Sequence, residues 1–175
     1  MFKFKTVFLR GNSFFYFYTI MEASLSDIKK ELQEQNKADL LVLCIRLAKF
    51  KKENKELLAY LLFEPDEQVY IEKIKKNTDM FFEEINFSNA YFIKKSVRKI
   101  LRMINKHIRF ATSKQVEAEL LLHFCNCFVT FSIPTRKSRQ LLNIYEGQVK
   151  KYKLALSTLH EDMQYDLNRQ SLIPE

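Results

Sequence analysis

The chain has very little glycine and proline. Among its 175 residues, glycine occurs only as Gly11 and Gly147, and proline only as Pro65, Pro134 and Pro174. Hairpins, tight turns and phosphate-cradling loops depend on these residues, because glycine adopts positive φ angles and proline presets a turn. Their scarcity argues against β-rich folds and Walker-type loops. It favours helices joined by short polar connections.

Cysteines and long apolar runs are also few. Cys44, Cys125 and Cys127 are an odd number in apolar surroundings, which predicts reduced thiols in a cytoplasmic protein. No segment has the roughly 18 consecutive apolar residues of a transmembrane helix. The hydrophobic content of 47% nevertheless supplies a core for a domain of this length.

The first twenty residues differ from the rest. Lys3, Lys5 and Arg10 precede an aromatic run over residues 14–20 that no small-residue cleavage site follows. Regular helical patterning begins after Met21. We therefore expect residues 1–20 to lie outside the fold, as an N-terminal extension or as sequence upstream of the natural start, with membrane association as an alternative.

Caps and apolar periodicity predict an all-α domain over residues 21–175. The expected helices are at about 24–35, 38–50, 55–63, 66–85, 89–110, 114–131 and 135–166. The second and third are apolar on nearly every side, so we expect both deep in the core. The architecture is either an irregular bundle of six or seven helices or a short HEAT-like stack of helical hairpins.

Acidic residues are absent between Glu84 and Glu117, although the chain carries 21 of them and a net charge of +8. Within this stretch one predicted helix has seven cations opposite its apolar stripe: Lys94, Lys95, Arg98, Lys99, Arg102, Lys106 and Arg109. A face that is only solvated normally includes acidic partners at i,i+4. We therefore expect an anionic partner, with an ordinary solvated face as the alternative.

A second basic cluster, Arg136, Lys137 and Arg139, opens the last predicted helix. Cations are unfavourable at a helix N-terminus unless an anion binds there, because the helix dipole already places positive charge at that end. If successive helices alternate in direction, this cluster lies at the same end of the bundle as Lys94 and Lys95. A solvated loop with screened charges is the alternative.

The last predicted helix also carries an apolar seam. Its members follow one another at steps of three and four residues: Leu142, Tyr145, Val149, Tyr152, Leu156, Leu159 and Met163. Such a seam serves either docking along the chain's own bundle or self-association as a homodimer. Gly147 lies within this helix and indicates a kink or a close contact.

Chemical motifs are few. In the run from His123 to Cys127, those two residues share a helix face, whereas Cys125 points nearly opposite. A metal would need further ligands from tertiary folding, so we expect packing cysteines, no metal and no cofactor. The candidates for such further ligands are Cys44, His107 and His160. His107 itself is expected to be half-buried and hydrogen-bonded.

No nucleophile elbow, Walker loop, HExxH or EF-hand motif occurs, which favours a non-catalytic protein. Residues 25–32, 39–44, 47–52 and 60–66 together resemble a family of small uncharacterised bacterial all-helical proteins. The resemblance covers about the first third of the chain after Met21 and implies no activity. We expect a helical binding module for nucleic-acid backbone or for an acidic protein, or else an interaction scaffold or homodimer.

Overall fold

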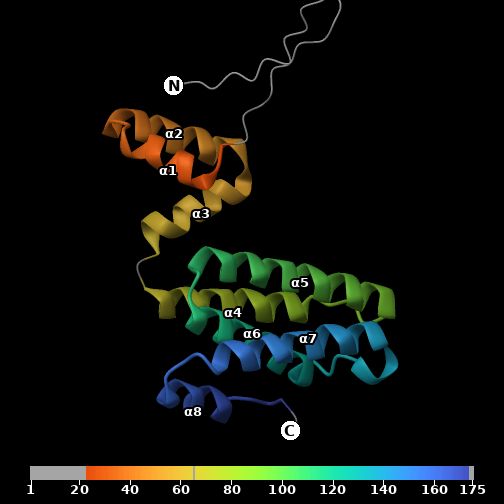
Figure 1. Ribbon diagram of the computed structural model, residues 1–175. Helices are drawn as coiled ribbons and strands as arrows, with labels where there is room; N and C mark the ends of the chain where they lie inside the picture. The colour runs from red at the N-terminus through yellow and green to blue at the C-terminus, as the bar shows by residue number, and fades with distance from the viewer. Residues whose placement is uncertain (1–22, 65, 174–175) are drawn as a thin grey trace, which may run out of the picture. The chain divides into compact units, whose positions relative to one another are not determined.

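The computed structural model describes residues 23–64 and 66–173, and the predicted extension over 1–20 lies outside them (Figure 1). The described residues form eight α-helices, one short 3-10 helix and no strand. In chain order they are α1 (Leu25–Gln33), α2 (Lys37–Phe50), α3 (Lys52–Phe63), α4 (Glu67–Glu83), α5 (Ala90–Ala111), α6 (Lys114–Thr130), η1 (Thr135–Lys137), α7 (Arg139–Leu156) and α8 (Glu161–Arg169). The all-α class is thus confirmed. None of the described helices has the length and apolar character needed to cross a membrane.

The chain divides into two compact units, with the boundary between Leu47 and Ala48 inside α2. The sequence predicts one domain over residues 21–175, and this stays a prediction. In the first unit, Ser24 caps α1 through a capping box in which its hydroxyl accepts from the Asp27 amide.

The prediction that α2 and α3 lie deep in the core is wrong. Neither helix contains a buried residue, and Val42 and Phe63 are 63% and 76% exposed. Apolar side chains around a whole helix show that it has material to bury, but burial also needs neighbouring elements on every side. In α3, Tyr60 is one of the partly covered residues, with its ring 4.6 Å from that of Tyr70 on α4.

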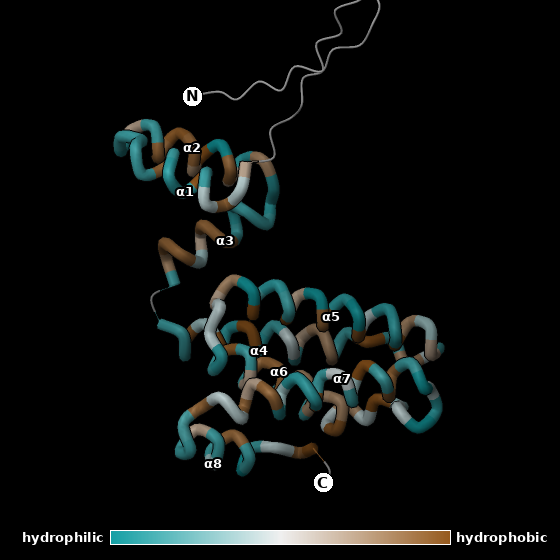
Figure 2. The backbone as a smooth tube through the Cα atoms, viewed as in Figure 1, coloured by the Kyte–Doolittle hydropathy of each residue, from teal (hydrophilic) through white to brown (hydrophobic). Residues whose placement is uncertain are grey.

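The core of the second unit is built by α4, α5, α6 and α7, which alternate in direction along the bundle (Figure 1). Helix α6 is the central element, because it packs against α4, α5 and α7 and buries ten of its seventeen residues. Phe82 on α4 is fully buried, with its ring 5.7 Å from that of Phe124 on α6. In Figure 2, α5 is mostly hydrophilic, with hydrophobic residues at intervals along it.

The helix predicted over 135–166 is interrupted twice. Its start is η1, and a turn over Ser157–His160 separates α7 from α8. At this turn the hydroxyls of Ser157 and Thr158 donate to the carbonyls of Leu154 and Ala155, so side chains replace continuing helical hydrogen bonds. His160 then caps α8.

Candidate polyanion-binding face

Helix α5 forms as the sequence predicts. The Asn89 side chain caps its first turn by accepting from the Tyr91 amide at 2.9 Å. One stripe of the helix is buried in the core: Ile93, Val97, Ile100, Ile104 and Phe110. The cations occupy the opposite face, which positions them on a rigid helix with a fixed spacing.

The first five of these cations have no acidic partner within ion-pair distance in the described part of the chain: Lys94, Lys95, Arg98, Lys99 and Arg102. Two of them contact an aromatic ring or a backbone carbonyl instead. The Lys99 ammonium lies 5.2 Å from the centre of the Phe81 ring, and Arg102 donates to the Arg98 carbonyl at 3.3 Å. The positive charge of this segment is therefore uncompensated among the described residues.

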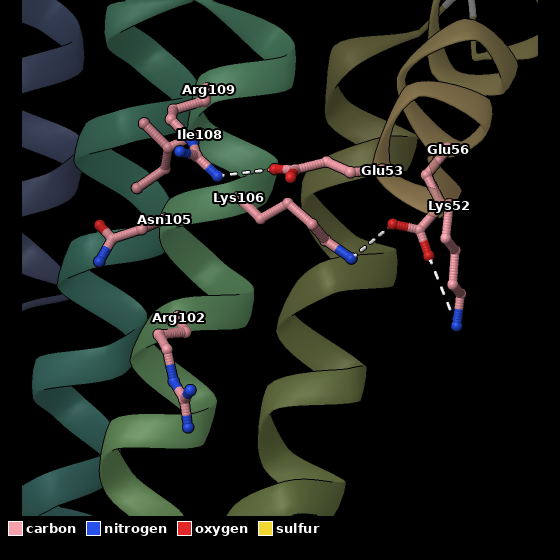
Figure 3. A pocket seen from close by; sticks show the side chains of 8 residues that line it. All are labelled: Lys52, Glu53, Glu56, Arg102, Asn105, Lys106, Ile108 and Arg109. Carbon is pink, nitrogen blue, oxygen red and sulfur yellow. Dashed lines mark hydrogen bonds and ion pairs between the residues drawn. The ribbon is translucent and has the colours of Figure 1, made fainter. Parts of the chain in front are cut away.

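The last two cations are neutralised by α3 (Figure 3). The Lys106 ammonium lies 2.8 Å from a Glu56 carboxylate oxygen, and the Arg109 guanidinium lies 2.7 Å from a Glu53 oxygen. The hydrogen bond from Lys106 lowers the pKa of Glu56. The sequence predicts both residues as part of the cationic face, and in the structure each has an acidic partner on α3.

A groove of about 720 Å³ lies between α3 and α5, and both ion pairs line it. Figure 3 shows Arg102 on this groove, with its guanidinium away from the two carboxylates. The boundary between compensated and uncompensated charge on α5 thus falls between Arg102 and Lys106.

The second basic cluster lies where the helix order predicts it. Arg136 and Lys137 are in η1, and Arg139 is the first residue of α7, whose cap is Ser138. All three are exposed, and no acidic partner is recorded for them within the described ranges. Because α4 to α7 alternate in direction, α5 and α7 begin at the same end of the bundle (Figure 1).

The predicted apolar seam is covered by the chain itself. Tyr152 and Leu156 are buried, and Tyr145, Val149 and Leu159 pack against the core from partly buried positions. Leu142 and Met163 are partly buried too, and Met163 lies beyond the α7–α8 turn. Docking within the bundle therefore accounts for the seam.

His107 is half-buried and hydrogen-bonded, as predicted, and its partner is the Tyr70 hydroxyl at 2.6 Å from Nδ1. Burial, with a smaller contribution from Lys106, lowers the pKa of His107 to about 4. Burial also raises the pKa of Tyr70. At neutral pH the pair is uncharged and serves packing between α4 and α5.

The His123–Cys127 segment lies on α6. Cys125 and Cys127 are both buried, and burial raises the pKa of Cys125 to about 12. His123 and Cys127 share a face, as predicted, and Asp79 on α4 contacts both. Asp79 cannot be found from the sequence, because it lies 44 residues before His123 and only the packing of α4 on α6 brings the two together.

Comparison with known proteins identifies no relative: no family model, curated protein or solved structure matches the chain. The resemblance to a family of small bacterial helical proteins therefore stays a prediction.

Proposed function

We propose that this protein binds the phosphate backbone of nucleic acid through the first part of α5, without reading base sequence. The observation that supports the proposal is the set of five cations, from Lys94 to Arg102, with no acidic partner among the described residues. Lys106 and Arg109 on the same helix are paired with carboxylates of α3. A polyanionic ligand would supply such negative charges to the first five cations.

The dimensions of the face suit such a ligand. Lys94 and Arg102 are eight residues apart, which is about 12 Å along a helix axis. Double-stranded DNA carries one negative charge per about 1.7 Å of axis, so this length of duplex presents about seven phosphates. About seven phosphates are enough for each of the five cations to contact one.

An exposed aromatic ring favours single strands over duplexes. Tyr91 is 61% exposed and lies on the cationic face, since it precedes Lys95 by four residues and Arg98 by seven. A base stacked on such a ring contributes about 1–3 kcal/mol without sequence preference. Bases within a duplex are already stacked on their neighbours, so a single strand gains more from Tyr91.

Fluorescence anisotropy with labelled random single-stranded DNA, single-stranded RNA and duplex tests the proposal over a range of salt concentrations. The test variant combines Lys95→Glu, Arg98→Glu and Arg102→Glu, three exposed cations without recorded ion pairs. We expect weaker binding to every sequence and a log–log salt slope reduced by about 0.7 per lost contact on single strands. Tyr91→Ala should weaken single-strand binding more than duplex binding.

The matched control makes the same change in net charge elsewhere. Lys150, Lys151 and Lys153 are exposed on α7, and their reversal to Glu should leave affinity nearly unchanged. Equal losses in the two triple variants would show that net charge alone drives binding. No binding by the native protein at low salt would refute the proposal.

A second function, a protein-interaction scaffold, is favoured by the exposed apolar side chains of α3. Leu61, Leu62 and Phe63 at the end of that helix are 65% to 76% exposed. If the native protein binds no nucleic acid, these residues are the next to test. Light scattering measures self-association, which a Leu62→Ser variant should weaken relative to the native chain.

A further inference from the structure

Three side chains with metal-binding atoms meet between α4 and α6. Donor atoms of Asp79, His123 and Cys127 all lie within 4.8 Å of one another. One Asp79 carboxylate oxygen lies 2.8 Å from His123 Nε2 and 3.5 Å from Cys127 Sγ. The carboxylate therefore contacts both the imidazole and the thiol.

The arrangement follows from helix geometry. His123 and Cys127 are four residues apart on α6, so both point to the same side, and that side packs against α4. Asp79 follows the fully buried Thr78 on α4 and reaches the edge of this contact. Both helices belong to the same unit, so their packing holds the three side chains in place.

Burial is graded across the cluster. Cys127 is 3% exposed, whereas His123 and Asp79 are half-buried. The sulfur thus lies on the inner side, and the imidazole and carboxylate lie where an ion can enter from solvent. Cys125 points away from the cluster and takes no part in it.

The two distances from the Asp79 oxygen are close to those of a tetrahedral metal site, and the imidazole nitrogen and the sulfur lie within 4.8 Å of each other. Zinc binds sulfur at about 2.3 Å and nitrogen or oxygen at about 2.0–2.2 Å, which places neighbouring donors roughly 3.3–3.6 Å apart. The sulfur–oxygen distance of 3.5 Å already lies in this range. The nitrogen–oxygen distance of 2.8 Å has to widen by only about 0.5 Å, within the reach of side-chain rotation.

We propose that Asp79, His123 and Cys127 bind a divalent transition-metal ion of the zinc class, with a fourth position for water. Thiolate and imidazole select such ions over magnesium and calcium, which prefer oxygen ligands. On binding, Cys127 releases its thiol proton to solvent. The proton that His123 Nε2 donates to Asp79 moves through solvent to Nδ1, which frees Nε2 to coordinate the ion. The thiolate and carboxylate charges then balance the two charges of the ion.

This site shares no residue with the cationic face of α5.

Burial and the Asp79 carboxylate raise the pKa of Cys127, so without an ion the thiol keeps its proton. An ion that contacts both groups removes this penalty, because a single positive centre stabilises thiolate and carboxylate together.

Cobalt titration of the reduced full-length protein, purified without an affinity tag, tests the site. Co²⁺ reports on its ligands through a thiolate charge-transfer band in the ultraviolet and visible bands typical of tetrahedral coordination. We expect one equivalent bound, one proton released and displacement by Zn²⁺. Cys127→Ser should abolish the thiolate band, whereas Cys125→Ser, a buried cysteine on the same helix, should keep it.

Two further variants keep the test valid if Cys127→Ser fails to fold. Asp79→Asn and His123→Gln change half-buried positions, and each should weaken cobalt binding at least tenfold, since outer-shell changes alone cost about 10–100-fold. Zn²⁺ should raise the melting temperature of the native protein more than that of either variant. Absence of the thiolate band in the native protein, equal loss in the two cysteine variants, or cobalt affinity unchanged by Asp79→Asn would overturn the proposal.

Discussion

His107 should make the stability of this protein fall in mild acid. Its imidazole is packed between Tyr70 and Phe110 and accepts or donates one hydrogen bond, to the Tyr70 hydroxyl. The charged groups around it are Lys106 on its own helix, Glu56 on α3 and Lys73 on α4. Burial is the largest influence on the ring, and it disfavours the protonated form.

The sign and size of the effect follow from the two protonation equilibria. In the unfolded chain His107 takes up a proton near its ordinary pKa of about 6.5, but in the folded chain only at a pKa of about 4. Between these values the unfolded state binds more protons, so the free energy of unfolding falls as the pH falls. The full difference corresponds to at most about 3 kcal/mol, reached near pH 4 and absent above about pH 7.

Urea unfolding followed by circular dichroism, at several pH values from about 7 to 4, measures this loss. The variant His107→Asn keeps a polar group near the position of Nδ1, but that group does not titrate. Between about pH 7 and 4 its free energy of unfolding should therefore fall by less than that of the native protein, with a difference of up to about 3 kcal/mol. Carboxylates such as Glu56 also lose their ion pairs in acid, and comparison with the variant subtracts that contribution. His160→Asn, at an exposed cap, is the matched control and should follow the native protein. Identical pH dependence in native protein and His107→Asn would refute the reasoning.

Two further stability predictions concern α6 and α7. Glu119→Gln should lower the free energy of unfolding by about 1–3 kcal/mol, because the buried Glu119 carboxylate lies 2.9 Å from the ammonium of Lys75, which would keep only an exposed acidic partner. Glu117→Gln on the same helix breaks an exposed pair with Lys114 and should cost less than about 0.5 kcal/mol; equal losses in thermal unfolding would contradict the buried-pair argument. Gly147→Ala should raise the free energy of unfolding by about 0.5–1 kcal/mol, since no heavy atom beyond the helix's own backbone and its chain neighbours lies within 4 Å of the added Cβ. The close contact at Gly147 that the sequence offers as one alternative is therefore wrong, and a less stable variant would contradict this reasoning.

Local features were predictable from the sequence where the interacting residues lie close together in it. The helix predicted at about 89–110 and its apolar stripe depend on residues a few positions apart, and both appear in the structure. The two cationic clusters begin helices at one end of the bundle because α5, α6 and α7 are joined by short connections, which alternate their direction.

Features that depend on residues far apart in the sequence were not predictable. Nothing near Lys106 or Arg109 indicates that carboxylates some fifty residues earlier would neutralise them. The Asp79 contact with His123 has the same origin. For α2 the sequence predicts the apolar pattern correctly but not its exposure, because composition does not show whether enough neighbouring surface exists to cover a helix.

The central position of α6 also has a consequence for synthesis. Its leucine and phenylalanine side chains are covered in large part by α7, which the ribosome makes only afterwards. At about 5–20 residues per second, the roughly 26 residues from the end of α6 to Leu156 take about 1–5 s to translate. Until α7 has been made and has packed, one side of α6 lacks its native cover, so the incomplete chain carries an apolar helix face that the finished protein conceals.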